Sequence, residues 1–289
     1  MKLQYFDLHC DTATKMYADG SSFLEPTGHI NAPALSVFEH MTQFFAVFIN
    51  DANRNLGMDY FRAVTENLKE ETDQIRNLTP MLSTEGGNVI EGDPANLDLL
   101  AEYGVKIFGF VWNGKNALAT GALCDNSEGL TETGKDAAKR LEKLGIYPDC
   151  SHLSDRGFFD LADTFAGPII ATHSNARSVF DHPRNLTDEQ LRLIFERGGL
   201  VGLNLYPNII GESPSIEDLL PHAQKMLDLG GENGLCLGCD LDGVSALPSG
   251  FNDVSDIPVL YAVLENEFGK TLAEKIVSGN ASRFFGQKQ

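Results

Sequence analysis

The feature that most constrains the fold of this 289-residue chain is a repeated alternation of short apolar runs with longer amphipathic runs. The short runs are typical of strands, and the longer runs have the spacing of helices packed on a sheet. Eight strands are predicted, over residues 5–11, 42–50, 80–85, 105–112, 146–152, 168–173, 200–206 and 235–240. Eight strand and helix units in about 250 residues are typical of a (β/α)8 TIM-type barrel, with an open doubly wound sheet as the alternative.

The organisation of the chain favours one barrel domain over residues 1–289, because no internal repeat and no linker rich in Ser, Gly or Pro divides it. Two helix ends are predicted from local chemistry. Thr187 to Gln190 have the pattern of a capping box, and residues 134–144 combine strong helix formers with Gly145 at the expected stop. Residues 13–41 are expected to form an irregular loop after the first strand.

The charge balance restricts the partners of this chain. It has 41 Asp and Glu against 22 Lys and Arg, a formal net charge of −19. Nucleic acid and anionic membranes are poor partners for it, because their phosphates need clustered Lys and Arg. No stretch approaches the roughly 20 apolar residues that span a bilayer, and the N-terminus lacks the apolar region of a secretory leader. These features predict a cytoplasmic protein without a membrane partner.

Polar and ionisable residues stand at the ends of the predicted strands, where α/β proteins place their working groups. Five of the eight strands end in a residue that can bind a metal, although Asp, Glu and His are depleted in strands. The strand-end candidates are His9, Asp11, Glu85, Trp112, Asn113, His152, His173, Tyr206 and Asp240. Taken singly, each histidine could be a satisfied core residue and each carboxylate a local turn or helix-start group.

The candidates taken together indicate a metal centre. His9 and Asp11 are two residues apart, so the pleat of a strand would point both to the same side. Three histidines and three carboxylates are too many ligands for one catalytic zinc ion and suit two. A pair of ions needs a bridging carboxylate, and we expect Glu85 to fill this role. His9 and Asp11 would then bind one ion, and His152 and His173 the other.

At these residues the sequence resembles the membrane (renal) dipeptidase family, peptidase family M19, within the amidohydrolase superfamily of metal-dependent barrels. Six pieces carry the resemblance in order along nearly the whole chain: DLHCDT (7–12), EGG (85–87), GIYPDCSHLS (145–154), ATHSNARSV (171–179), PRNL (183–186) and GCDLDGV (238–244). The resemblance implies a metallopeptidase that hydrolyses small dipeptides, with a D-residue accepted at the carboxyl side in some members. It also suggests a homodimer.

The resemblance implies a role for each matching residue. His9 and Asp11 match the ligands of one Zn²⁺, Glu85 matches the bridging carboxylate, and His152 and His173 match the ligands of the second Zn²⁺. Asp240 matches the acid/base residue that moves a proton from the attacking water to the leaving amine. Arg184 matches the residue that pairs with the terminal carboxylate of the substrate. Asp149 could orient a neighbouring ligand or simply end a strand.

One position departs from the family pattern. Trp112 stands where mammalian members have a histidine that contacts the substrate carbonyl. The Trp112 indole N–H and the Asn113 amide could still donate to a developing oxyanion, or Trp112 could be a packed aromatic at the barrel rim. We count Trp112, Asn113 and Tyr206 with Arg184 as substrate-binding candidates. The mammalian signal peptide and lipid anchor have no counterpart here, which favours a soluble microbial-type member.

Two other functions stay open on the sequence. The same metal centre could act on another small amide, such as a lactam or an N-acyl amino acid. A metal-binding or sensory barrel could also have lost catalysis through the change at Trp112. Retention of Asp240 argues against this second alternative, because a silent site has no need of a proton shuttle.

Overall fold

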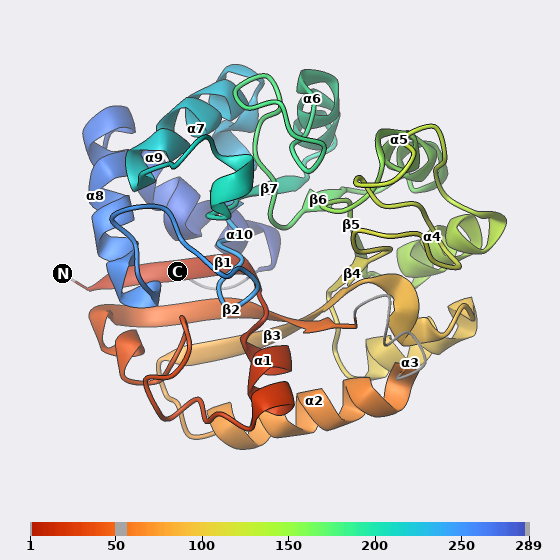
Figure 1. The fold of residues 1–289 in the computed structure, drawn as a ribbon, viewed down its shortest axis with the longest axis horizontal. Helices are drawn as coiled ribbons and strands as arrows, with labels where there is room; N and C mark the ends of the chain where they lie inside the picture. The colour runs from red at the N-terminus through yellow and green to blue at the C-terminus, as the bar shows by residue number, and fades with distance from the viewer. Residues whose placement is uncertain (1, 50–56, 287–289) are drawn as a thin grey trace.

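The computed structural model describes residues 2–49 and 57–286, and its sheet is a closed barrel. The eight strands follow one another in sequence order and each pairs in parallel with the next, β8 closing on β1 (Figure 1). The strands are β1 (Leu3–Cys10), β2 (Phe38–Phe48), β3 (Leu78–Glu85), β4 (Ile107–Gly109), β5 (Tyr147–Asp149), β6 (Ile170–Ala171), β7 (Leu200–Leu203) and β8 (Leu235–Leu237). The predicted (β/α)8 barrel is confirmed, and the open sheet is excluded.

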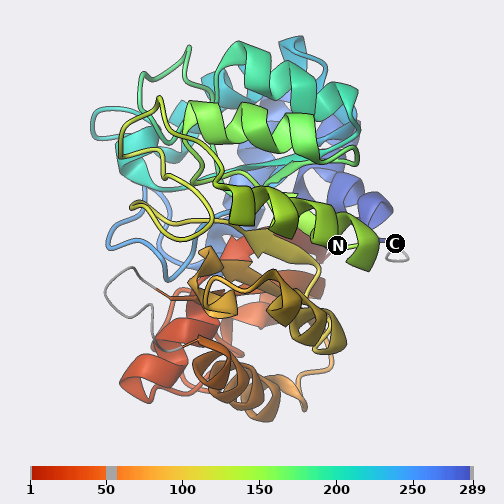
Figure 2. The ribbon, with the colours of Figure 1, turned by 90° about the vertical axis from the view of Figure 1, so that its right-hand side faces the viewer.

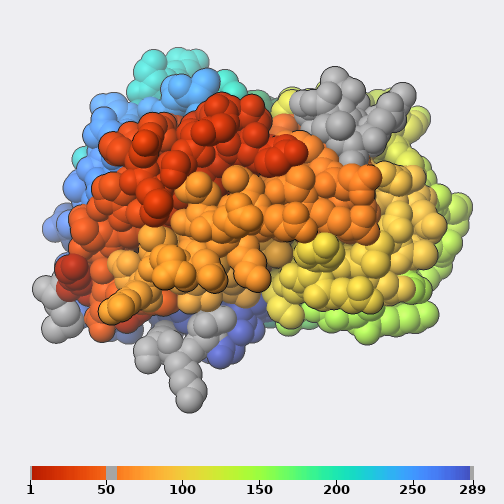
Figure 3. All heavy atoms as spheres, turned by 90° about the horizontal axis from the view of Figure 1, so that it is seen from below, coloured from red at the N-terminus to blue at the C-terminus, as the bar shows by residue number. Residues whose placement is uncertain are grey.

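Helices cover the outside of the barrel. They are α1 (Thr12–Asp19), α2 (Gly57–Thr72), α3 (Leu97–Glu102), α4 (Glu132–Leu144), α5 (Asp155–Thr164), α6 (Asp188–Glu196), α7 (Leu219–Asp228), α8 (Ile257–Phe268), α9 (Lys270–Glu274) and α10 (Asn280–Phe284). Figure 2 shows α4, α5 and α6 stacked side by side, and Figure 3 shows the face covered by α1, α2 and α3. Among the described residues, no helix is long and apolar enough to cross a membrane.

The two predicted helix ends are confirmed. The Thr187 side chain accepts a hydrogen bond from the Gln190 amide while the Gln190 side chain accepts one from the Thr187 amide, which completes the capping box of α6. Gly145 ends α4 with a φ of 68°, a left-handed conformation that glycine adopts without steric cost. The helix α6 therefore begins, and α4 ends, where the capping residues predict.

An aromatic cluster closes the barrel at the beginnings of its strands. Phe6 and Phe44 lie inside the barrel, both almost completely buried, and the ring of Phe285 packs on both, at centroid distances of 5.7 Å from Phe6 and 4.9 Å from Phe44. Phe284 packs beside Tyr147 of β5 at 4.7 Å. The turn after α10 is therefore part of the core, and this end of the barrel is filled with side chains.

The structure corrects two expectations about element boundaries. The segment 13–41 is not irregular throughout, because it contains α1 and the beginning of β2 at Phe38. The strands β4 to β8 are shorter than predicted and stop before Trp112, His152, His173, Tyr206 and Asp240, which lie in the loops that follow. Residue 50, the predicted end of the second strand, lies outside the described residues.

Candidate metal centre

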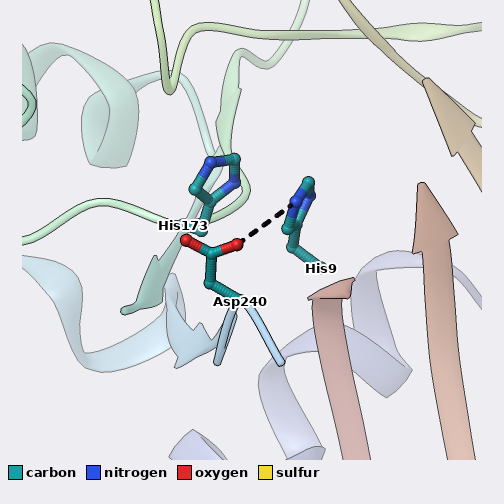
Figure 4. Close-up of side chains that lie close together, drawn as sticks. All are labelled: His9, His173 and Asp240. Atoms are coloured by element: carbon teal, nitrogen blue, oxygen red, sulfur yellow. Dashed lines mark ion pairs between the residues drawn. The ribbon is translucent and has the colours of Figure 1, made fainter. Parts of the chain in front are cut away.

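The five predicted metal ligands and the predicted acid/base residue Asp240 meet at the mouth of the barrel, and all six are buried. His9 and Asp11 come from the end of β1, Glu85 is the last residue of β3, and His152, His173 and Asp240 follow β5, β6 and β8 within a few residues. Three overlapping groups have ligand atoms within 4.8 Å of one another: His9–Asp11–Glu85, Glu85–His152–His173 and His9–His173–Asp240. Figure 4 shows the third group, with Asp240 pointing at His9.

The carboxylate of Glu85 faces two groups of ligands with different oxygens. Its Oε2 lies 3.4 Å from His9 Nε2, and its Oε1 lies 2.8 Å from His152 Nε2 and 3.9 Å from His173 Nε2. Glu85 is the central ligand because β3 lies between the strands of the two groups and ends level with the mouth. This arrangement is what a bridging carboxylate between two ions requires.

Hydrogen bonds fix the proton position on two of the histidines. His152 Nδ1 lies 3.1 Å from the side-chain oxygen of Asn113, and His173 Nδ1 lies 2.7 Å from the hydroxyl of Thr172. Each Nδ1 therefore carries the proton and each Nε2 presents a lone pair. The two Nε2 atoms are 2.9 Å apart. Two lone pairs and a carboxylate oxygen converge on one space, so a cation is the group that fits it.

The charges at the mouth point to the same chemistry. Burial and the charge of Asp11 raise the pKa of Glu85 to about 8, and burial raises the pKa of Asp240. Burial, with the nearby charges of Arg184 and His9, holds the pKa of His152 and of His173 well below the ordinary value. The structure thus holds carboxylates that resist ionisation together and two histidines, His152 and His173, that stay neutral, which is the state in which imidazole binds metal. The pKa of His9 is raised instead, because Asp11 and Glu85 outweigh its burial.

Unpartnered atoms support the fit to divalent ions. His9 Nε2 and Asp11 Oδ1 are buried, and neither has a hydrogen-bond partner among the described residues. A buried polar atom without a partner is costly, and a metal ion would satisfy both. Imidazole nitrogens with carboxylate oxygens are a donor set that zinc accepts. The residues present therefore fit a divalent metal, and the shared Glu85 fits a pair.

Asp240 is held in place by its backbone and by a neighbouring amide. Its φ is 59°, an unusual value for a residue with a side chain, and Asn204 Nδ2 donates to its Oδ2 at 3.2 Å. Its other oxygen lies 3.7 Å from His9 Nε2. Gly243 lies against the carboxylate, because a Cβ added there would be 2.4 Å from Asp240 Oδ1 and 2.2 Å from Asp11 Oδ2.

Arg184 reaches the mouth from the loop between β6 and α6. One guanidinium nitrogen, Nη2, contacts His152 Nε2 at 3.0 Å, while the other, Nη1, is buried without a hydrogen-bond partner among the described residues. The side chain is 7% exposed, so it is held in the wall of the site and is not a free surface arginine. Its unpaired N–H groups lie where an anionic group of a ligand could pair with them.

The other predicted substrate contacts line a cleft of about 470 Å³, which is also lined by Asp11, Glu85, His152 and Asp240. Trp112 packs edge-on against Phe48 at a ring distance of 5.1 Å, which makes an aromatic wall. Tyr206 lines the same cleft, and its hydroxyl accepts a hydrogen bond from Asn208. Asn113 lines it too, but its side-chain oxygen is used by His152, so only its amide N–H groups can serve a substrate.

Two residues that sequence reasoning did not propose stand directly behind the ligands. Asp7 accepts hydrogen bonds from the amides of His9 and Cys239, and Thr172 joins Asp149 to His173. The signal for Asp7 was a carboxylate inside an otherwise buried strand. Thr172 gave no signal, since a threonine next to a strand-end histidine is unremarkable until the carboxylate behind it is known.

Comparisons with known proteins show what this chain is similar to. The family described as Membrane dipeptidase (Peptidase family M19) matches residues 1–289. An uncharacterised protein in the pqqA 5′ region of Klebsiella pneumoniae is 33% identical over 192 residues, which are 62% of this chain and 70% of that protein. An uncharacterised dipeptidase of Schizosaccharomyces pombe is 31% identical over 213 residues, which are 71% of this chain but only 52% of that protein.

Two solved structures share the fold over essentially the whole chain. A metallopeptidase of Rhodobacter sphaeroides, liganded with a phosphinate mimic of the dipeptide L-Ala-D-Ala, has a TM-score of 0.88 at 23% identity and full coverage of both chains. A metallopeptidase of family M19 called dipeptidase AC has a TM-score of 0.83 at 26% identity and covers 99% of both chains.

Proposed function

The chain belongs to the membrane dipeptidase family, peptidase family M19, and on that premise we propose that it is a metal-dependent dipeptidase with two zinc ions at the barrel mouth. The observation that carries the proposal is the position of Glu85, whose two oxygens face separate ligand groups. His9 and Asp11 would hold one ion with Glu85, and His152 and His173 would hold the other with it. A bound pair would lower the pKa of a water molecule and polarise the scissile carbonyl.

The residues of the chain would then move the proton and hold the substrate. Asp240 faces His9 and is fixed by Asn204, so its carboxylate is in place to take a proton from the attacking water and return it to the leaving amine. Burial raises the pKa of the Asp240 carboxyl above its ordinary value, which favours the protonated form that an acid needs. Arg184 would pair with the terminal carboxylate of the dipeptide through its unpartnered Nη1.

The rest of the cleft would orient the scissile amide. Trp112 lines it with an indole N–H, and Asn113 lines it with an amide that still has donors to offer. Either group could donate to the carbonyl oxygen in place of the histidine found in mammalian members. Tyr206 closes the cleft on the side of β7. We infer that a D-residue is accepted at the carboxyl side, as in the ligand of the Rhodobacter sphaeroides relative.

The decisive experiment measures metal content together with hydrolysis of L,L and L,D dipeptides, with and without a chelator. We expect about two ions per chain, turnover of dipeptides, loss of turnover on chelation and its return with Zn²⁺. Fewer than one ion per chain, or turnover that ignores chelation, would contradict the proposal. A single domain over residues 1–289, a cytoplasmic location and a homodimer are parts of the proposal that rest on the sequence and the resemblance.

A further inference from the structure

At the mouth of the barrel, one buried carboxylate stands between β1 and β8, and another stands between β5 and β6. Beyond the first, β1 and β8 stay paired, because the Asp240 amide donates to the His9 carbonyl at 3.1 Å and the Asp11 amide donates to the Leu241 carbonyl at 2.9 Å. Asp7 of β1 accepts from the amides of His9 at 2.9 Å and Cys239 at 3.0 Å. Asp149 of β5 accepts from the amides of Ser151 at 2.9 Å and Thr172 at 3.0 Å. Each carboxylate thus takes one amide from its own strand, two residues on, and one from the end of the neighbouring strand.

The amides that these carboxylates bind belong to the backbone that carries the metal-ligand candidates. Cys239 directly precedes Asp240, and Thr172 directly precedes His173. Asp7 therefore acts together with the direct hydrogen bond from the Asp240 amide to the His9 carbonyl in fixing the spacing of His9 and Asp240 across β1 and β8. Asp149 likewise sits between β5 and β6, where His152 and His173 leave the sheet. Both carboxylates are buried and neither lines the cleft, so they can act only through these neighbours.

The Asp149 carboxylate reaches His173 through one hydroxyl group. Thr172 Oγ1 lies 2.5 Å from Asp149 Oδ2 and 2.7 Å from His173 Nδ1. A carboxylate only accepts, so the Thr172 hydroxyl donates its proton to Asp149 and must accept from His173. The Ser151 hydroxyl donates to Asp149 at 2.6 Å, accepts from the His173 backbone amide at 3.1 Å and lies 3.1 Å from Thr172 Oγ1, so it contacts the backbone of His173 while Thr172 contacts the ring. The proton of His173 is thereby confined to Nδ1, and Nε2 is left for a metal.

The Asp7 carboxylate has no such relay. Its remaining partners are the Tyr5 hydroxyl at 2.7 Å and the Gln43 side-chain amide at 3.1 Å, both donors. Four donors satisfy the charge of Asp7 within the protein, so its effect on the site is confined to the backbone of β1 and β8. The two carboxylates are alike in their backbone contacts and differ in how directly they reach a metal-ligand candidate.

We propose that Thr172 is a positioning residue through which the Asp149 carboxylate orients the imidazole of His173. Asp7 has the corresponding role for His9 and Asp240, which it positions through the backbone. The inference rests on the proposed metal site and adds residues that set its affinity. Removing the relay frees the His173 ring to rotate and to place its proton on Nε2, where it excludes a metal. Loss of partners behind a ligating histidine typically weakens metal binding by about 10- to 100-fold.

Two variants of Thr172 separate the relay from simple packing. Thr172→Val keeps the shape of the side chain and loses the hydroxyl, whereas Thr172→Ser keeps the hydroxyl and loses a methyl group. Zn²⁺ affinity and stoichiometry are measured on folded, chelator-stripped protein by competition with a coloured chelator. We expect Thr172→Val to bind the second ion about 10- to 100-fold more weakly, and Thr172→Ser to bind both ions within a few-fold of the unchanged protein.

The outcomes distinguish this inference from the proposed function. Equal Zn²⁺ affinities for Thr172→Val and the unchanged protein would overturn the relay while leaving the metal site intact. Fewer than one ion on the unchanged protein would instead defeat the proposed function itself. A weak affinity in both Thr172 variants would mean that packing and not the hydroxyl matters, which also overturns the relay.

For Asp7→Asn we expect weaker binding of the ion held by His9 and Asp11, with the ion at His173 retained. Unchanged binding of both ions would overturn the role of Asp7.

Discussion

His152 Nε2 lies 2.9 Å from His173 Nε2, and both nitrogens present lone pairs because their Nδ1 protons are held by Asn113 and Thr172. Two facing lone pairs repel each other, and in the metal-free protein the Arg184 guanidinium, 3.0 Å from His152 Nε2, offsets this repulsion at that nitrogen. Metal should therefore stabilise the fold strongly. At a free Zn²⁺ concentration 100 times Kd, we expect a gain of about 2.7 kcal/mol in the free energy of unfolding per site.

This first prediction is checked by thermal unfolding of chelator-stripped protein with increasing Zn²⁺. His152→Ala serves as the matched variant, because it removes one of the two facing nitrogens. It should gain less from Zn²⁺ than the unchanged protein. An unfolding temperature that Zn²⁺ does not move would contradict the interpretation of the paired histidines.

Gly243 gives a second prediction, because there is no room for a side chain beside the ligands. A methyl group on Gly243 would lie 2.2 Å from Asp11 Oδ2 and 2.4 Å from Asp240 Oδ1. Gly243→Ala should therefore displace both carboxylates and lower kcat/KM on the order of 100-fold, since small misplacements at a reacting centre are costly.

Gly211→Ala is the control for this change. Nothing lies within 4 Å of the methyl group it would add, and its φ is not in the left-handed region. It should leave kcat/KM and metal content unchanged. If both glycine variants kept full activity, the close approach of Gly243 to Asp11 and Asp240 would have no catalytic consequence.

The third prediction concerns the pH dependence of the metal-free protein. Burial raises the pKa of Glu85 from 4.5 to about 8, so the folded state keeps a proton that the unfolded state releases. The carboxylates of Asp11 and Glu85 outweigh burial and raise the pKa of His9, which acts in the same direction. Between pH 6.5 and 8 the free energy of unfolding should fall as pH rises, by up to about 1.4 kcal/mol per pH unit for each group.

Below pH 6.5 a second effect enters. The lowered pKa values of His152 and His173 make the folded state bind fewer protons than the unfolded state, so stability is lost as pH falls. Urea unfolding at several pH values with chelator present measures both the decline in stability above pH 6.5 and the loss of stability below it. Glu85→Gln should flatten the decline above pH 6.5, and Zn²⁺ should remove it, because bound Glu85 stays ionised. A metal-free protein that gains stability from pH 6.5 to 8 would refute the assignment.

Arg184 provides the fourth prediction, and it decides between a dipeptide and another small amide. If its unpartnered Nη1 binds the substrate carboxylate, Arg184→Ala should raise KM for dipeptides on the order of 100-fold, the scale of a lost charge-assisted hydrogen bond. A dipeptide with an amidated C-terminus is the matched substrate, because it lacks the carboxylate. It should be hydrolysed poorly and almost equally by both proteins. A small change in KM for the free dipeptide would favour a lactam or an N-acyl amino acid.

The sequence predicted the parts of this protein that leave a local signal. Ionisable residues at the ends of buried strands are rare, and this made His9, Glu85 and His173 recognisable before their neighbours were known. The helix ends at Thr187 and Gly145 were predictable for the same reason, because capping depends on residues close together in the chain.

Other features could not be read from the sequence because their cause lies in a distant segment. The strands after β3 end early. The carboxylate of Asp7, between β1 and β8, and that of Asp149, between β5 and β6, take backbone amides. The role predicted for Asn113 was incomplete, because its side-chain oxygen accepts a hydrogen bond from His152, which follows the next strand, β5. The helix α1 was missed in a segment expected to be irregular; Thr14 in this helix bonds the backbone of Ala46 and Phe48 in β2.

The closure of the barrel between β1 and β8 has a consequence for the order of events during synthesis. His9 lies in the first strand and Asp240 follows the last, yet their side chains face each other, and the ring of Phe285, beyond α10, stacks on Phe6. A ribosome must therefore release nearly the whole chain before the first-made strand, already able to pair with β2, finds its second partner, β8. Until then His9 has no site to join, so the nascent protein should capture metal late, and its earliest strand should be the natural client of a chaperone.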